Sequence, residues 1–187
     1  VDKRAAKPVT ESVAEQNADP NQGRKVPEGI KGEDVVSVNE YYEGGREVAQ
    51  GVKAGDQKAI DQMATEMAAK IPPGATVVPM PSRDGKATSM LAVAQKIADI
   101  VGGKVADVLT GNKRESMYDA KKDGRQLTET ELGITAGEQP SGPVYIVDNV
   151  LATGTTAKAA MKAIPGAKLA VYSIDSTANQ NVPIADK

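Results

Sequence analysis

The sequence predicts an α/β protein with a mostly parallel sheet flanked by helices, and two observations lead to this prediction. Short apolar stretches rich in Val, Ile and Leu alternate along the chain with stretches whose apolar residues recur at helical spacing. The order strand, helix, strand then repeats, which is typical of parallel strands joined by crossover helices. We therefore expect a sheet with helices packed on its faces.

Local signals set the expected boundaries of these elements. Asp56 is a good N-cap for a long amphipathic helix, and Pro72-Pro73-Gly74 stops it. Gly102-Gly103 ends the next amphipathic helix. In chain order the expected elements are an edge strand from Val35, a helix at 46–53, a helix at 56–71, a strand at 75–80, a helix at 90–101, strands at 104–109 and 144–147, a helix at 155–164 and a strand at 168–174.

Two segments show no sustained periodicity. Residues 1–34 are rich in Lys, Glu, Pro, Asn, Gln and Gly, so we interpret them as a polar, flexible tail or linker that precedes a domain at 35–187. Residues 111–142 are also polar. Loops of that length are usually functional or disordered, and we expect a mobile loop there.

Composition excludes several classes of function. The chain has no cysteine and no histidine, which excludes thiolate and imidazole metal sites, disulfides and histidine acid–base catalysis. Lys and Arg number 23 against 25 Asp and Glu, which argues against general nucleic-acid binding. No apolar run suits a membrane helix and the first residues do not resemble a signal peptide, so we expect a cytoplasmic protein without membrane contact. The start at Val1 leaves open a larger polypeptide, and a homo-oligomer is also open.

The segment DNVLATGTT, residues 148–156, follows the apolar strand VYIV and precedes a helix. Open α/β sheets bind ligands where strands lead into helices, and a helix N-terminus favours phosphate. Gly154 permits a tight turn, while Asp148 and Asn149 could hold sugar hydroxyls or approach a divalent cation. The segment therefore predicts a sugar-phosphate site, and the alternative is that Asp148 and the threonines only cap the helix. Neither a P-loop nor a dinucleotide glycine motif occurs.

VYIVDNVLATGTT resembles the phosphoribosyl-pyrophosphate (PRPP) motif of type I phosphoribosyltransferases, in which four apolar residues and two acids precede a threonine-glycine phosphate loop. YYEGGREVAQGVKAGDQKAIDQMATEMA and VVPMPSR resemble the ComF-like branch of that family in order and spacing. The resemblance covers about residues 38–176 and implies a Rossmann-like phosphoribosyltransferase core. The zinc ribbon of the ComF-like branch is missing, so a role in DNA uptake is not carried over.

The resemblance implies a role for each matching residue. Asp148 and Asn149 would contact the ribose hydroxyls, Asp148 would lie near Mg²⁺, and the 5-phosphate would be held by Ala152, Thr153, Gly154, Thr155 and Thr156. The family's pyrophosphate loop is matched by Ser82, Arg83, Asp84, Gly85 and Lys86, and catalytic roles would fall to Asp148, Asn149, Arg83 and Lys86. The cations that could close over the pyrophosphate are Lys113, Arg114, Lys121, Lys122 and Arg125. A solvated turn is the alternative for the loop, and ordinary surface charge is the alternative for each cation.

The implied activity is Mg²⁺-dependent transfer of a phosphoribosyl group from PRPP to an unidentified nitrogenous small-molecule acceptor, with release of pyrophosphate. Two departures from the family favour a rival, a non-catalytic PRPP or nucleotide sensor within a larger protein. Asn149 replaces the usual second acid, and Ala152 replaces a threonine or aspartate. A purely structural module is a third alternative. Among the five tyrosines, the only aromatic residues, Tyr41 and Tyr42 could be either packing residues or ligand contacts.

Overall fold

The computed structural model describes residues 19–115 and 117–179, and its main element is a sheet of five parallel strands. The strands in spatial order are β1 (Val35–Glu40), β7 (Lys168–Ile174), β6 (Val144–Leu151), β2 (Thr76–Pro79) and β3 (Lys104–Val105). Val78 pairs with Ile146, and Ile146 pairs with Leu169, so β6 is the central strand. The predicted α/β class with a parallel sheet is confirmed, and the architecture is consistent with a Rossmann-like fold.

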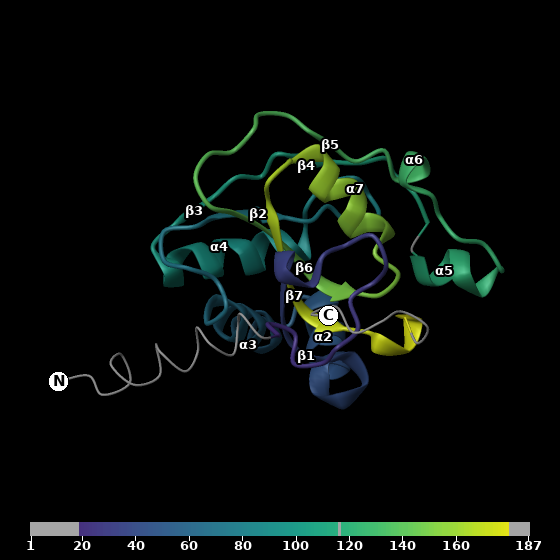
Figure 1. Ribbon diagram of the computed structural model, residues 1–187, viewed down its shortest axis with the longest axis horizontal. Helices are drawn as coiled ribbons and strands as arrows, with labels where there is room; N and C mark the ends of the chain where they lie inside the picture. The colour runs from purple at the N-terminus through teal and green to yellow at the C-terminus, as the bar shows by residue number, and fades with distance from the viewer. Residues whose placement is uncertain (1–18, 116, 180–187) are drawn as a thin grey trace.

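Helices cover both faces of the sheet (Figure 1). One face carries α2 (Arg46–Lys53), α3 (Gln57–Ala68) and α4 (Ser89–Val101), and the other carries α7 (Thr155–Ala163). Successive strand residues point to opposite faces, so Val77 is buried with α3 and α4 while Val78 is buried on the side of α7. Within the described residues, no helix has the length and apolar character needed to cross a membrane.

The helix boundaries follow the signals in the sequence. The Asp56 carboxylate accepts a hydrogen bond from the Lys58 backbone N–H at 3.1 Å, as expected of an N-cap. Gly102 ends α4 with a left-handed φ of 69°, a conformation that glycine adopts without strain. Short turns complete the described chain at η1 (Gly32–Asp34), η2 (Tyr41–Gly45) and η3 (Ser176–Asn179).

The expected strand at 104–109 is divided between two sheets. β3 ends at Val105, and β4 (Leu109–Thr110) pairs antiparallel with β5 (Thr135–Ala136) instead. A turn in which the Val108 N–H donates to the Ala106 carbonyl, at 3.0 Å, redirects the chain. Leu109 is then buried with the residues under α7. The apolar pattern of residues 104–109 thus reflects burial of this segment and not one continuous strand.

The polar segment 111–142 contains short elements of its own. They are α5 (Met117–Lys122), α6 (Glu129–Leu132) and β5, and Thr128 with Glu131 forms a capping box at the start of α6. Leu127 and Leu132 form a small apolar cluster with Ala120 of α5 and Ala159 of α7. These apolar residues are too few to form the apolar face of a long helix, but together they pack the segment against α7.

The described part of the expected tail, residues 19–34, packs on the domain. Val26 is 1 % exposed and is buried with the residues under α7. Arg24 Nη2 donates to the Ser37 backbone oxygen of β1 at 3.1 Å, and Asn21 Nδ2 donates to the Gly32 oxygen at 3.2 Å. The folded unit thus begins before the predicted boundary at residue 35, because isolated apolar residues bury here without periodicity. The rest of the expected tail, residues 1–18, lies outside the described residues.

Candidate functional site

The two segments expected to bind ligand follow neighbouring strands of the sheet. The chain moves outward from β2 to β3 through α4, and in the opposite direction from β6 to β7 through α7. The loops after β2 and β6 therefore lead to helices on opposite faces, which makes this pair of strand ends a topological switch point. Open α/β sheets bind ligands at such a point, outside the carboxyl ends of the strands. We call this side of the sheet the carboxyl edge.

The loop after β6 is shorter than expected, because the strand continues through Asp148 and Asn149 to Leu151. Only Ala152, Thr153 and Gly154 connect the strand to α7. Gly154 is the N-cap of α7 and has a left-handed φ of 88°. A glycine has no side chain with which to cap, so the backbone N–H groups of Thr155 and Thr156 are left for a ligand.

Capping does not explain Asp148. Its carboxylate accepts a hydrogen bond from the Asn149 backbone N–H at 2.7 Å, within the strand, rather than from the first turn of α7. In the described part of the chain, no side-chain hydrogen bond reaches the first-turn N–H groups of α7. An anion would complete that helix end, since the N-terminal dipole and the free donors both favour negative charge.

Asn149 is held toward α2, with one atom left unpaired. The side chain is 7 % exposed, and its Nδ2 donates to the Ala49 backbone oxygen at 3.2 Å. This contact fixes the amide orientation, because only the NH₂ group can donate to a carbonyl. Asn149 Oδ1 is buried and has no hydrogen-bond partner among the described residues. Such an orphaned acceptor calls for a donor from water or a ligand.

Asp148 lies between opposing electrostatic influences. Burial raises the pKa of Asp148 to about 6, although the Asn149 N–H and the positive charges of Lys53 and Arg114 act in the opposite direction. Burial also lowers the pKa of Arg114, and the charge of Asp148 opposes that shift. The charges of the carboxylate and the guanidinium therefore act on each other at the carboxyl edge. Because Asp148 and Asn149 are consecutive in β6, their side chains leave the strand on opposite sides.

The predicted pyrophosphate loop folds around one of its own acids. Asp84 Oδ1 accepts from Ser82 Oγ at 2.8 Å and from the Lys86 N–H at 3.1 Å, and these two bonds lower the pKa of Asp84. The Ser82 N–H donates to the Lys86 oxygen at 2.9 Å and closes the turn. Arg83 and Lys86 remain exposed. The loop is therefore an ordered turn that presents two cations outward.

The start of segment 111–142 is attached to this loop by its backbone. The Gly111 N–H donates to the Gly85 oxygen at 3.0 Å, and the Arg114 N–H donates to the Arg83 oxygen at 2.7 Å. A Cβ on Gly85 would lie 2.3 Å from the Gly111 oxygen, so this approach requires glycine. The attachment explains why Arg114, of the expected lid cations, is the one whose charge acts on Asp148.

The other cations of segment 111–142 have different surroundings. Arg125 forms ion pairs with Glu115 and Glu131, and the second of these measures 3.4 Å. Arg83, in the neighbouring loop, pairs with Asp119 at 3.7 Å. Three lysines are exposed, namely Lys113, Lys121 and Lys122. Arg125 is thus neutralised within its own segment, and the structure does not bring it to Asp148.

Two features of the site escaped sequence reasoning. The positive charge of Lys53, at the end of α2, acts on Asp148, and the only signal for Lys53 was its place before Gly55-Asp56 in the ComF-like pattern. Pro27 and Ile30 lie against Gly154, where an added Cβ would be 2.7 Å from Pro27 Cγ and 3.2 Å from Ile30 Cδ1. No pattern in residues 1–34 could have indicated that contact.

No protein-family model matches this sequence, and comparison with curated proteins gives no significant match. Function is therefore inferred from the residues and their geometry. Among the described residues, no three of His, Cys, Asp and Glu come together as a metal site. Mg²⁺ often uses one or two carboxylates together with substrate phosphates and water. The single carboxylate of Asp148 fits an ion that is held mainly by a bound diphosphate.

Proposed function

We propose that the protein is a Mg²⁺-dependent phosphoribosyltransferase with a type I phosphoribosyltransferase-like core, which binds PRPP at the switch point between β2 and β6. The observation that supports this most is the N-terminus of α7, where Gly154 leaves free N–H donors shortly after β6, the strand that carries Asp148 and Asn149. The cationic loop that follows the adjacent strand β2 adds a second anion subsite at the same carboxyl edge of the sheet. A purely structural module would need neither feature.

Each part of PRPP has a matching group. The 5-phosphate binds the N–H groups of Thr155 and Thr156, with the threonine hydroxyls as further donors. The ribose hydroxyls donate to the Asp148 carboxylate, and a water bridges the ribose to Asn149 Oδ1, which is otherwise unpaired and lies on the other side of β6. The pyrophosphate is bound by Arg83, Lys86 and Arg114. These three cations lie on two segments that are joined by backbone hydrogen bonds.

The reaction is a displacement at the ribose C1. The bond from C1 to the pyrophosphate oxygen breaks and its electron pair leaves with pyrophosphate, while the acceptor nitrogen forms the new bond to C1 and releases its proton to solvent. Mg²⁺, when bound, neutralises charge on the leaving pyrophosphate. Arg83, Lys86 and Arg114 add fixed positive charge there, and Asp148 orients the sugar and stabilises positive charge developing at C1.

Calorimetric titration with PRPP, with and without Mg²⁺, tests the binding step. Adding purine and pyrimidine bases while monitoring pyrophosphate then tests the transfer. We expect binding that strengthens with Mg²⁺ and pyrophosphate release with one class of base. Absence of PRPP binding would refute the proposal.

One observation favours a second candidate, a PRPP or nucleotide sensor. Asn149 is pinned by its bond to Ala49 and offers a neutral acceptor in place of an acid, which weakens the negative pair at the ribose. A sensor would bind PRPP without releasing pyrophosphate for any base. It would also transmit binding through α2, so the Asn149–Ala49 bond gives the sensor a physical route that the transferase does not need.

A further inference from the structure

A pair of tyrosines stands at the carboxyl edge beyond β7. The rings of Tyr41 and Tyr42 meet edge to face, with centroids 4.9 Å apart and planes at 80°. Tyr42 is 57 % exposed, which is unusual for a large side chain in a packed pair. Tyr41 is more enclosed, and burial raises its pKa while the nearby Arg46 opposes that shift. The pair therefore presents one open ring supported by a second ring.

The turn that carries the pair is fixed against the sheet. Gly44 in η2 has a φ of 113°, which is open to glycine. Gly45 lies so close to β7 that a Cβ would fall 1.9 Å from Ser173 Oγ. The backbone is thus pressed onto the end of the sheet, and the rings project from a rigid turn. Rigid aromatic rings lose little conformational entropy when a ligand binds.

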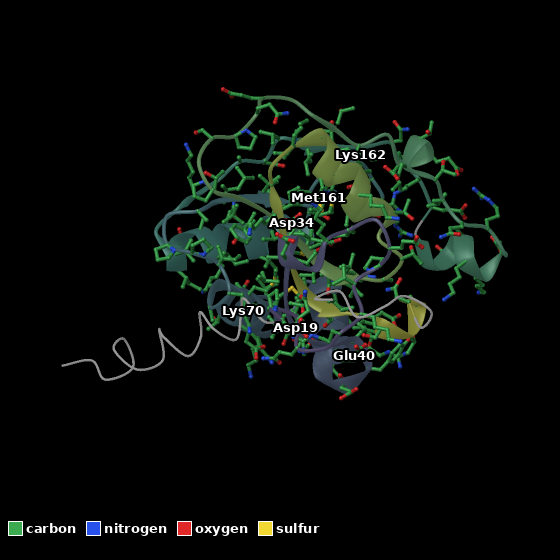
Figure 2. All side chains as sticks on the ribbon, viewed as in Figure 1. Asp19, Asp34, Glu40, Lys70, Met161 and Lys162 are labelled. Carbon is green, nitrogen blue, oxygen red and sulfur yellow. The ribbon has the colours of Figure 1, made fainter. Side chains whose placement is uncertain are left out.

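Strand register places the pair level with the phosphate loop. Glu40 pairs with Ile174, and Ile174 pairs with Leu151, so the next residues, Tyr41 and Ala152, follow at the same height. Two strand spacings separate them, roughly 10 Å. Glu40 Oε2 also accepts from the Ser176 N–H at 3.0 Å, and Figure 2 shows Glu40 beside η3 at this end of β1.

The next step rests on the proposed function. In a displacement at C1, the incoming nitrogen approaches from the side opposite the leaving group. The pyrophosphate loop follows β2, on one flank of β6, while β7 and β1 lie on the other flank. An acceptor that approaches from the side away from the pyrophosphate loop would come over β7 and β1. Tyr41 and Tyr42 are the aromatic residues that the described chain places at the ends of those strands.

We infer that Tyr42, backed by Tyr41, forms the wall of the acceptor subsite and binds a planar nitrogen heterocycle by stacking. Aromatic rings recognise nucleobases through their faces, and one such stack changes affinity substantially. This assignment names the acceptor class that the PRPP site leaves open.

The test uses two fluorescent bases, 2-aminopurine and pyrrolocytosine, whose emission changes on stacking. Each is titrated into the full chain with saturating PRPP and Mg²⁺, and again without them. The variants are Tyr42→Ala and Tyr42→Phe, with Ile100→Ala as a matched control because Ile100 is 50 % exposed on α4, away from the pair. PRPP affinity is measured in parallel by calorimetry.

We expect the native protein, Tyr42→Phe and Ile100→Ala to bind one of the bases equally, and Tyr42→Ala to bind it about tenfold more weakly or worse. PRPP affinity should be the same in all four proteins. Equal base binding by Tyr42→Ala would overturn the inference, as would native protein that binds neither base. An oligomer that becomes monomeric in Tyr42→Ala, by sedimentation, would reassign the pair to a subunit interface. Loss of PRPP binding in every protein, with base binding retained, would refute the proposed transferase but keep the aromatic site.

Discussion

At the scale of single residues, Asp148 is the group whose charge state couples stability to function. Its folded pKa of about 6 exceeds the ordinary value of 3.8, so the native state holds more protons than the unfolded state between these values. Stability therefore falls as the pH rises from about 4 to about 6, and it stays lower above that range. The site keeps an ionised carboxylate at neutral pH at some cost in stability, a cost that a sugar ligand or a cation would offset.

Asp148→Asn should therefore stabilise the free protein while weakening the ligand site. Above pH 6 we expect a gain of about 2 kcal/mol in the free energy of unfolding, because the variant has no buried charge, and no gain below pH 4. PRPP binding should weaken and should depend less on pH between 5 and 7, where only the phosphates of PRPP would still titrate. Urea denaturation at several pH values, with calorimetry, measures both effects.

Asp84→Asn is the matched control, since hydrogen bonds lower the pKa of Asp84. The ionised Asp84 carboxylate therefore stabilises the folded protein, whereas the ionised Asp148 carboxylate destabilises it. The control should be less stable than the native protein at neutral pH, and the difference should disappear as the pH falls through the lowered pKa of Asp84. A loss of stability in Asp148→Asn at neutral pH would contradict the electrostatic account of that residue.

Asn149→Asp tests the orientation of the neighbouring amide. The substitution places a carboxylate oxygen against the Ala49 carbonyl in place of the Nδ2 donor. We expect a loss of roughly 2–4 kcal/mol in the free energy of unfolding at neutral pH, easing at low pH where the protonated acid can donate. Thermal melts at pH 4 and pH 7 would show this. Equal melting temperatures for variant and native protein at pH 7 would mean that the amide is not fixed by Ala49.

At the scale of elements, sequence reasoning succeeded where an element carries its own signals. α3 and α4 have helical periodicity together with Asp56 and Gly102 at their ends, so both helices were predicted, and only the end of α3 was placed three residues too late. β6 was predicted too short because Asp148 and Asn149 are polar. Pairing with β7 nonetheless extends the strand through them, as Asp148 opposite Val171 shows.

The parts that could not be predicted depend on tertiary contacts. Residues 19–34 and 111–142 bury single apolar side chains, such as Val26 and Leu132, in sites built by other elements. The sequence did indicate both halves of the candidate site, after β2 and after β6. It could not indicate that the charges of Lys53 and Arg114 act on Asp148, because that depends on where α2 and the Arg83–Arg114 backbone bond place these residues.

The contact between Gly154 and residues 27–30 can be tested with two glycines of equal conformation. Gly154 has a φ of 88° and Gly166 a φ of 87°, but only Gly154 has neighbours in the space that a Cβ would fill. Gly166→Ala should cost about 1–2 kcal/mol from backbone strain alone. Gly154→Ala should cost about 1 kcal/mol or more beyond that, from overlap with Pro27. Chemical denaturation of the two variants gives the difference.

PRPP affinity adds a second comparison between these variants. Gly154→Ala should reduce it, because the phosphate loop must shift to relieve the overlap, and Gly166→Ala should leave it unchanged, because its loop lies at the other end of the sheet. Equal stabilities of the two variants would show that residues 27–30 yield freely to an added methyl group. That result would mean that residues 27–30 do not hold the phosphate loop in a fixed position.

At the scale of the whole molecule, parallel topology gathers residues from distant parts of the chain at one edge. All five strands of the sheet end there, so the segments that follow β1, β2, β6 and β7 meet regardless of their separation in sequence. Because the connections after β2 and β6 cross to opposite faces of the sheet, the two loops diverge at the middle of that edge. The same topology leaves the amino edge to turns, which have no role in the proposed site.

Ligand binding should therefore slow hydrogen exchange at the carboxyl edge and leave exchange at the amino edge unchanged. With PRPP and Mg²⁺, we expect slower exchange in three carboxyl-edge segments, 82–88, 111–115 and 152–157, and no change in the amino-edge turns at 69–75 and 164–167. Ribose 5-phosphate is the matched ligand, since it lacks the pyrophosphate. It should protect 152–157 and leave 82–88 and 111–115 as in the free protein, because the cations of those segments would have no anion to bind. Protection of all three segments by ribose 5-phosphate would mean that they respond to closure of the whole edge, and protection of the amino-edge turns by either ligand would place the binding site elsewhere.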